Sequence, residues 1–298
     1  MVERLILSCL TAFLLLGCAG MKRIPEPVVA RIPGATEAFH RNQIVDLASG
    51  KAVPFDEFME DASTRDILFV GEIHDNPEHH LLQVQILQAL LTLFPSSAMA
   101  MEFFQQDQQG ILDRYTLEDM TEEAFLEEID WKRTWGFPYH FYRPLLLAAK
   151  QQRIRVVALN PPRGIVRKVA REGLSALNEE ERKQIPRDMD LSNESHKAYV
   201  REAYESHEQV DLKNFEFFYQ AQCIWEETMA RNISEFLKMQ NQKVIVFSGN
   251  GHIVRKFGIP DRVQRRLPVS VVTIMPFSLR KTVTLERDTA DFLWLTGP

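Results

Sequence analysis

Short apolar runs, separated by segments with helical periodicity, constrain the fold of this chain more than any other feature. Residues 67–70, 98–101 and 244–247 are continuously apolar, and residues 154–159 and 269–274 form two further runs. Continuous apolar runs of this length are typical of strands buried on both faces. Because amphipathic helical patterns alternate with them, the sequence predicts an α/β fold in which a mostly parallel sheet carries helices on both faces.

Local signals predict several further elements. Residues 43–47 and 51–53 flank a turn that ends in glycine, which favours a hairpin. A short helix is expected at 55–61. Asn76, followed by a proline, is typical of a helix N-cap, and Pro144 is expected to begin another helix that ends near residue 150.

A polar, helix-rich segment divides the predicted core. The longest helix is expected at about 212–239, and the segment before it, 172–211, is interpreted as a helical lid or insert. The α/β core would then comprise residues 41–171 and 212–298.

The N-terminus is interpreted as a targeting segment. Residues 5–16 are apolar but too few to span a bilayer comfortably. The run ends at Cys18 in a pattern that resembles a bacterial lipobox, so residues 1–17 would be a lipoprotein signal peptide. Cys18 would carry the lipid, residues 18–40 would be a spacer, and the outer membrane would be the expected location. The alternative is an ordinary secretory signal with an incidental cysteine.

Composition limits the partners of the chain. Its 298 residues carry a net charge of −6 and contain no long Lys/Arg run, so the sequence indicates no nucleic-acid partner. Cys9 would leave with the signal peptide and Cys18 would carry the lipid, so Cys223 would be the one free thiol and no intramolecular disulfide could form in the mature chain.

Polar residues follow four of the predicted strands. The carboxyl ends of parallel strands meet at one edge of a sheet, where ligands bind. A functional site is therefore expected from the side chains at these ends: Glu72, His74, Glu102, Asn160, Arg163 and His252.

Two imidazoles and two carboxylates can do several kinds of chemistry. His74, His252, Glu72 and Glu102 would suit a divalent Zn, Mn or Fe ion that activates water. Without a metal, either histidine could act as a general base oriented by a glutamate. The structural alternative is a buried polar network that only stabilises the fold. Arg163, near a helix start, would suit a carboxylate or a phosphate.

Two adjacent histidines follow the first of these strand ends. His79 and His80 lie in the first turn of the helix expected after Asn76, where the helix dipole favours neutral imidazoles that could ligate a metal. The alternative is an exposed helix terminus without a ligand.

Two GxxH motifs, at 71–74 and 249–252, enclose the strand-end Glu102. This layout resembles the Tiki/TraB/erythromycin-esterase superfamily. The strings at 71–80, 142–144, 158–161, 222–230 and 249–260 are similar to those of ChaN-like haem-binding lipoproteins. The resemblance covers about residues 40–275. It implies an outer-membrane lipoprotein of haem or iron handling, with haem held in a homodimer as a face-to-face pair, by a tyrosine ligand and His/Lys contacts to the propionates. Other branches imply a metal-dependent protease or esterase.

The iron ligand is not assigned by this resemblance. The pattern of the lid offers one set of candidates, on or next to one helical face. Tyr142, just before the helix expected to begin at Pro144, is another candidate. The alternative for the lid is an ordinary amphipathic surface helix. The lid candidates are His196, Lys197, Tyr199 and Tyr204.

Overall fold

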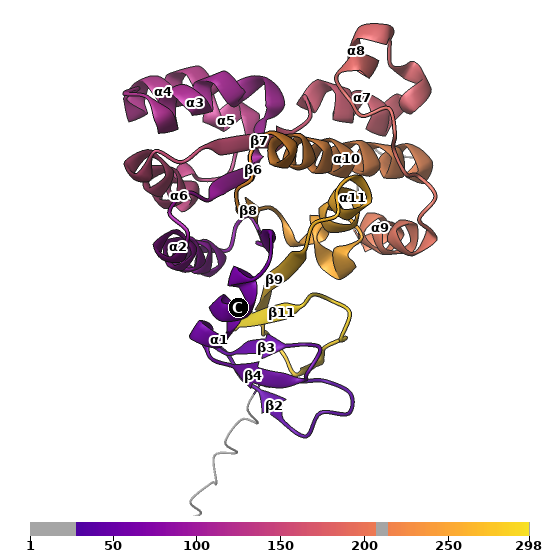
Figure 1. The fold of residues 1–298 in the computed structure, drawn as a ribbon. Coiled ribbons are helices and arrows are strands. Elements are labelled where there is room, and N and C mark those ends of the chain that lie inside the picture. Colours follow the sequence, from indigo (N-terminus) through magenta and orange to yellow (C-terminus); the bar gives the residue numbers. More distant parts are fainter. Residues whose placement is uncertain (1–27, 207–213, 298) are drawn as a thin grey trace, which may run out of the picture.

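The computed structural model describes residues 28–206 and 214–297, and an eight-stranded sheet forms its centre (Figure 1). The strand order is β4-β3-β11-β9-β5-β8-β6-β7. The strands from β11 to β7 run parallel, whereas β3 pairs antiparallel with β11 and β4. This confirms the predicted α/β fold with a mostly parallel sheet. The strands are β3 (Ile44–Asp46), β4 (Lys51–Val53), β5 (Ile67–Val70), β6 (Ala98–Gln105), β7 (Val156–Asn160), β8 (Val244–Phe247), β9 (Val271–Ser278) and β11 (Phe292–Thr296).

Helices follow and cover these strands (Figure 1). They are α1 (Phe55–Ser63), α2 (Pro77–Leu93), α3 (Gln109–Leu117), α4 (Glu122–Ile129), α5 (Trp131–Thr134), α6 (Tyr139–Gln152), α7 (Arg163–Glu172), α8 (Glu179–Lys183), α9 (Glu194–Ser206), α10 (Phe215–Met239) and α11 (Ile259–Arg266). Short 3₁₀ turns are η1 (Gln106–Gln108), η2 (Leu174–Ala176), η3 (Asn250–His252) and η4 (Val254–Lys256). None of these described helices is both long and apolar enough to span a bilayer.

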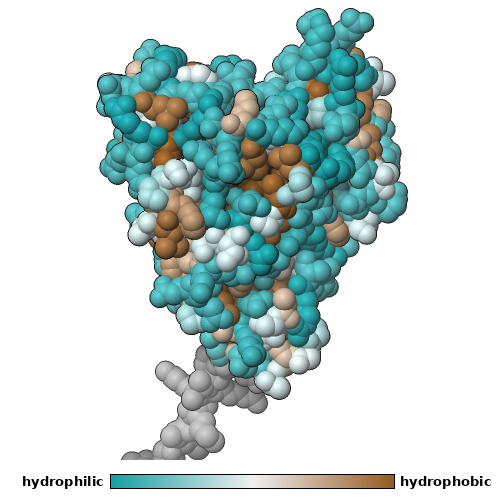
Figure 2. Space-filling model, in the orientation of Figure 1, coloured by the Kyte–Doolittle hydropathy of each residue, from teal (hydrophilic) through white to brown (hydrophobic). Residues whose placement is uncertain are grey.

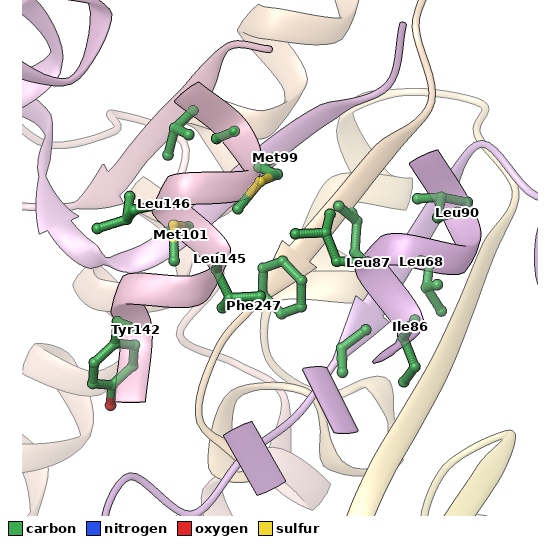
Figure 3. Close-up of a cluster of buried hydrophobic side chains, with 14 of the residues drawn as sticks. Leu68, Ile86, Leu87, Leu90, Met99, Met101, Tyr142, Leu145, Leu146 and Phe247 are labelled. Carbon is green, nitrogen blue, oxygen red and sulfur yellow. The ribbon is translucent and has the colours of Figure 1, made fainter. Parts of the chain in front are cut away.

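The apolar strands are buried on both faces because successive side chains point to opposite sides. Leu68 and Val70 of β5 pack with α2, whereas Ile67 and Phe69 pack in the cluster that contains residues of α10 and α11. Figure 3 shows the first of these clusters, where side chains of α2 and α6 meet those of the strands. Helices packed on both faces of the sheet thus support the carboxyl ends of its strands, where the polar residues lie.

The predicted local elements are largely confirmed. The hairpin is formed by β3 and β4, and the Asn76 side chain accepts a hydrogen bond from the Glu78 N–H at the start of α2. The prediction that Pro144 begins a helix is wrong, because α6 begins at Tyr139 and holds Pro144 in its second turn. The helix tolerates the proline because only one backbone hydrogen bond is lost.

Two groups of helices stand at the carboxyl end of the sheet. The α3–α5 group follows β6 and was not expected from the sequence. The second group comprises α7 and α8, and α9 packs on α10 nearby through the cluster of Val200, Tyr219 and Cys223. The predicted lid boundaries of 172 and 211 stay a prediction, and residues 207–211 lie outside the described part.

A small sheet lies beside the main one, with the order β10-β1-β2. Its strands are β1 (Ala30–Arg31), β2 (Ala38–Phe39) and β10 (Val283–Thr284). The predicted spacer therefore includes ordered strands in its later part. The predicted signal peptide, Cys18 and spacer residues up to 27 lie outside the described residues.

Candidate functional site

Glu72 is the centre of a buried hydrogen-bond network just after β5. It is 1% exposed, and its carboxylate accepts hydrogen bonds from the Tyr142 hydroxyl at 2.9 Å and from Gln83 Nε2 at 2.8 Å. His74 Nδ1 lies 2.6 Å from the same carboxylate. Burial disfavours the imidazolium, but the hydrogen bond to Glu72 and the nearby Glu102 carboxylate outweigh it and raise the pKa of His74. The network fixes the orientation of the His74 ring.

A second network joins β6, η3 and α10. Glu102 lies where the pairing of β6 with β7 shifts register, and its Oε2 accepts a 2.7 Å hydrogen bond from the Gly249 N–H. His252 lies between two carboxylates, with Nε2 3.5 Å from Glu102 Oε1 and Nδ1 3.3 Å from Glu226 Oε1. These carboxylates overcome the cost of burial and raise the pKa of His252 to about 10. Glu102, in turn, has its pKa lowered to about 2 despite burial, chiefly by His252.

The two networks adjoin at Gly249. A Cβ atom placed on Gly249 would lie 3.2 Å from His74 Nε2 and 3.6 Å from Glu102 Oε2. A side chain at this position would therefore strike the His74 ring. The structure thus brings Glu72, His74, Glu102 and His252 together from separate segments of the chain.

His79 and His80 do not form an exposed helix terminus, because both are buried. His79 Nδ1 accepts a hydrogen bond from the Ile73 N–H at 2.9 Å, and its Nε2 lies 3.2 Å from the Thr296 hydroxyl. Burial lowers the pKa of His79 to about 4. His80 Nε2 lies 3.1 Å from the carbonyl oxygen of His74, and its ring stacks on Phe141. Both histidines hold the first GxxH loop in place.

A cavity of about 620 Å³ opens beside His74, within the usual size range of ligand pockets. In Figure 2 the surface is notched between the α3–α5 group and the α7–α8 group, and hydrophobic residues gather beneath the notch. Aromatic side chains, neutral polar side chains and arginines line the cavity, and no acidic side chain of the described residues does. The aromatic lining residues are Phe103, Trp135, Phe137, Phe218 and Trp225, and the arginines are Arg163, Arg167 and Arg171.

The predicted strand-end residues share this region. Arg163 and Asn160 line the cavity, as His74 does. Glu102 and His252 are buried and do not line it, but the His252 ring lies 5.2 Å from the Trp225 ring of the lining.

The predicted haem contacts lie outside the cavity lining, apart from Arg163. Tyr142 is fully buried and its hydroxyl is bonded to Glu72. His196 is buried, with Nε2 3.2 Å from Glu226 Oε2. Lys197 pairs with Glu216 at 2.8 Å. Their roles toward haem stay predictions.

The two tyrosines of α9 differ in their surroundings. The Tyr199 hydroxyl lies 4.0 Å from the position of a Cβ on Gly251, and burial raises the pKa of Tyr199. The Tyr204 ring contacts Phe218, with 5.2 Å between the ring centroids. Phe218 lines the cavity, so Tyr204 adjoins its wall.

The predicted divalent metal centre is not found. Within residues 28–206 and 214–297, no three His, Cys, Asp or Glu side chains are grouped as a metal ion requires. The contacts explain this: His74 Nδ1 and both ring nitrogens of His252 face carboxylates, and Glu72 is occupied by three donors. Glu72 and His252 are therefore already engaged by groups of the protein itself.

Several site residues were not singled out from the sequence. Arg167 and Arg171 follow Arg163 at intervals of four residues, a spacing from which a shared helical face could have been predicted. Trp135 and Phe137 lie in a short loop whose sequence gives no sign of its position. Glu226, the second carboxylate at His252, stood within a family-like string without an assigned role.

A comparison with family models matches residues 58–263 to the family described as haem-binding uptake, Tiki superfamily, ChaN. The chain belongs to this family. Among solved structures, one of cofacial haem binding to ChaN of Campylobacter jejuni has a TM-score of 0.66 and 16% identity, covering 84% of this chain and 95% of that one. The erythromycin esterase EreC matches with a TM-score of 0.46 and 13% identity, covering 79% and 76%. The search of curated proteins found no match.

Membership of the ChaN family agrees with the resemblance inferred from the GxxH motifs. At 16% identity, the likeness to Campylobacter jejuni ChaN concerns the fold alone.

Proposed function

We propose that this ChaN-family protein binds haem in the cavity between α5 and α7. The supporting observation is the lining of the cavity. Haem is a flat apolar ring with carboxylates at one edge, and the cavity combines aromatic walls with arginines and contains no described acidic side chain. Family membership supports the same ligand.

A variant that fills the cavity tests this proposal. Ala170 lines the cavity, whereas Ser175 is exposed and does not. Haemin added to the full chain should produce a saturable Soret band. Ala170→Trp should weaken binding at least about 10-fold, which corresponds to about 1.4 kcal/mol, and Ser175→Trp should bind as the wild type does. Equal binding by all three proteins would contradict the proposed location.

For the iron ligand we retain the tyrosine implied by the family resemblance and favour Tyr204. Its ring contacts Phe218, which lines the cavity. Tyrosinate is an established haem ligand. His74 is the competing ligand, because it lines the cavity and a carboxylate orients its ring. Tyr204→Phe should change the ferric absorption spectrum, and His74→Ala should leave the ligand bands in place. The reverse pattern would assign the ligand to His74.

A lipid anchor and a dimer complete the proposal. Cys18 would carry the lipid and hold the protein at the outer membrane, as the lipobox-like sequence suggests. Cys18→Ala should then release the protein from the membrane fraction and abolish labelling with palmitate. Membrane retention by this variant would contradict the anchor. A homodimer is expected if two haems bind face to face.

Hydrolysis by Glu72, His74, Glu102 and His252 is the second candidate function. One observation favours it: His74 Nε2 and Glu102 Oε2 border the space above Gly249, where a water molecule could be activated. The proposed reaction uses these side chains without a metal. Ester or peptide turnover that survives chelators and is lost in both His74→Ala and Glu102→Gln would support it. Turnover unchanged by these substitutions would exclude this site.

A further inference from the structure

Three arginines form a row along α7. Arg163, Arg167 and Arg171 recur every fourth residue, and a rise of 1.5 Å per residue spreads their backbones over about 12 Å. All three are exposed and line the cavity. A single helix thus presents a strip of positive charge to one side of the cavity.

The charge of this row is not balanced within the described residues. None of the three arginines forms a salt bridge there, although the chain as a whole is acidic. Arg163 donates from Nη1 to the carbonyl oxygen of Arg133 at 3.1 Å, which leaves its charge uncompensated. Lys168, on another side of the same helix, does pair with Glu181 at 2.8 Å. The strip facing the cavity therefore attracts anions.

The remaining walls determine which anion fits. Trp135, Phe137 and Phe103 give an apolar surface, which an inorganic anion would not use. Guanidinium groups bind carboxylates with paired hydrogen bonds. A ligand with an apolar body and carboxylates along one edge would contact both surfaces.

We propose that Arg163, Arg167 and Arg171 bind the carboxylates of the ligand and so determine specificity for a carboxylate-edged macrocycle over its neutral ester. This inference rests on the proposed function, because it assigns one edge of the haem to α7 of the same chain. It extends the carboxylate site expected at Arg163 to the whole row.

The test compares haemin with haemin dimethyl ester, which keeps the ring and the iron but lacks the negative charges. Both are titrated into the full chain in detergent, with affinity measured from the Soret band and from tryptophan quenching. The variants are the neutral triple R163Q/R167Q/R171Q, the charge-retaining triple R163K/R167K/R171K, and a control triple of exposed arginines elsewhere, R31Q/R187Q/R280Q.

The neutral triple should bind haemin roughly 10-fold more weakly, since exposed ion pairs contribute little individually. It should bind the diester as the wild type does. The lysine triple should recover part of the lost affinity, and added salt should reduce haemin affinity in the wild type more than in the neutral triple. The control triple should bind as the wild type does.

Equal haemin binding by the wild type and the neutral triple would overturn the inference while leaving haem binding intact. Equal binding of haemin and its diester by the wild type would also overturn it. A wild type that binds neither ligand would refute the proposed function itself, so the two failures are distinguishable.

Discussion

At the scale of single residues, buried carboxylates define the site. The Glu72 carboxylate accepts hydrogen bonds from three donors. The Glu226 carboxylate forms ion pairs with His196, His252 and Arg262 at 3.2 to 3.4 Å. A buried charge is tolerated when several donors satisfy it. These glutamates thus position the imidazoles, whatever ligand the cavity receives.

Glu72→Gln should destabilise the fold strongly. The amide cannot accept from Tyr142, Gln83 and His74 together, so buried donors lose their partner. The expected loss is on the order of 3 kcal/mol in the free energy of unfolding, measured by urea denaturation. Glu60→Gln, at an exposed position of α1, is the matched control and should change little. Equal stability of the two variants would show that the network contributes nothing.

The buried His79 predicts a loss of stability in mild acid. Its pKa lies at about 4 in the folded chain, below its ordinary value of 6.5. The unfolded chain therefore binds the proton more readily between these values, and stability falls as pH decreases from 6.5 toward 4. The contribution of His79 is on the order of 3 kcal/mol at the acid end. Asp75 opposes and His80 adds to this shift.

The pH dependence of unfolding measures this effect. His79→Gln should have a flatter stability profile between pH 6.5 and 4, whereas His40→Gln, at an exposed position, should keep the wild-type slope. The ion pairs of Glu102 are lost at lower pH than this, because its pKa lies at about 2. A wild-type slope in His79→Gln would contradict the assignment.

At the scale of elements, α9 is held against α10 by the buried contact of His196 with Glu226. His196→Ala should loosen α9, which hydrogen exchange would detect as faster exchange of residues 194–206 than in the wild type. Lys197→Ala is the control, because its solvent-accessible pair with Glu216 contributes little. Unchanged exchange in α9 of His196→Ala would show that apolar packing alone holds the helix.

The strands could be predicted from the sequence, and the helical groups around the cavity could not. Runs such as 67–70 are too short for a typical helix, so a buried strand explains them best. Trp131, Trp135 and Phe137 belong to short elements, whose positions depend on tertiary packing rather than on periodicity. The start of the helix at Pro144 was predicted wrongly, because the preference of proline for the first turn is only a tendency and a longer helix can include it.

Part of the site could also be predicted. The strand-end rule brings Glu72 and Glu102 to one edge of the sheet from the order of the apolar runs alone. It could not place Tyr142 or Glu226, because both reach the site from helices. The contacts that occupy Glu72 and His252 depend on distances that a sequence does not contain.

At the scale of the whole molecule, the cavity lies between two helical groups on one sheet edge. If two haems stack face to face, as proposed above, haemin should shift the full chain from monomer to dimer in sedimentation velocity. Ala170→Trp should remain monomeric. A haem-loaded monomer would contradict the face-to-face pair.

The location of the iron tests the central claim most directly. Crystals of the chain grown with haemin allow the iron to be located by anomalous scattering. The proposed haem site predicts the iron peak in the cavity between α5 and α7, with the ring against Trp135 and Phe137 and its carboxylates toward α7. An iron peak outside this cavity would contradict the proposal.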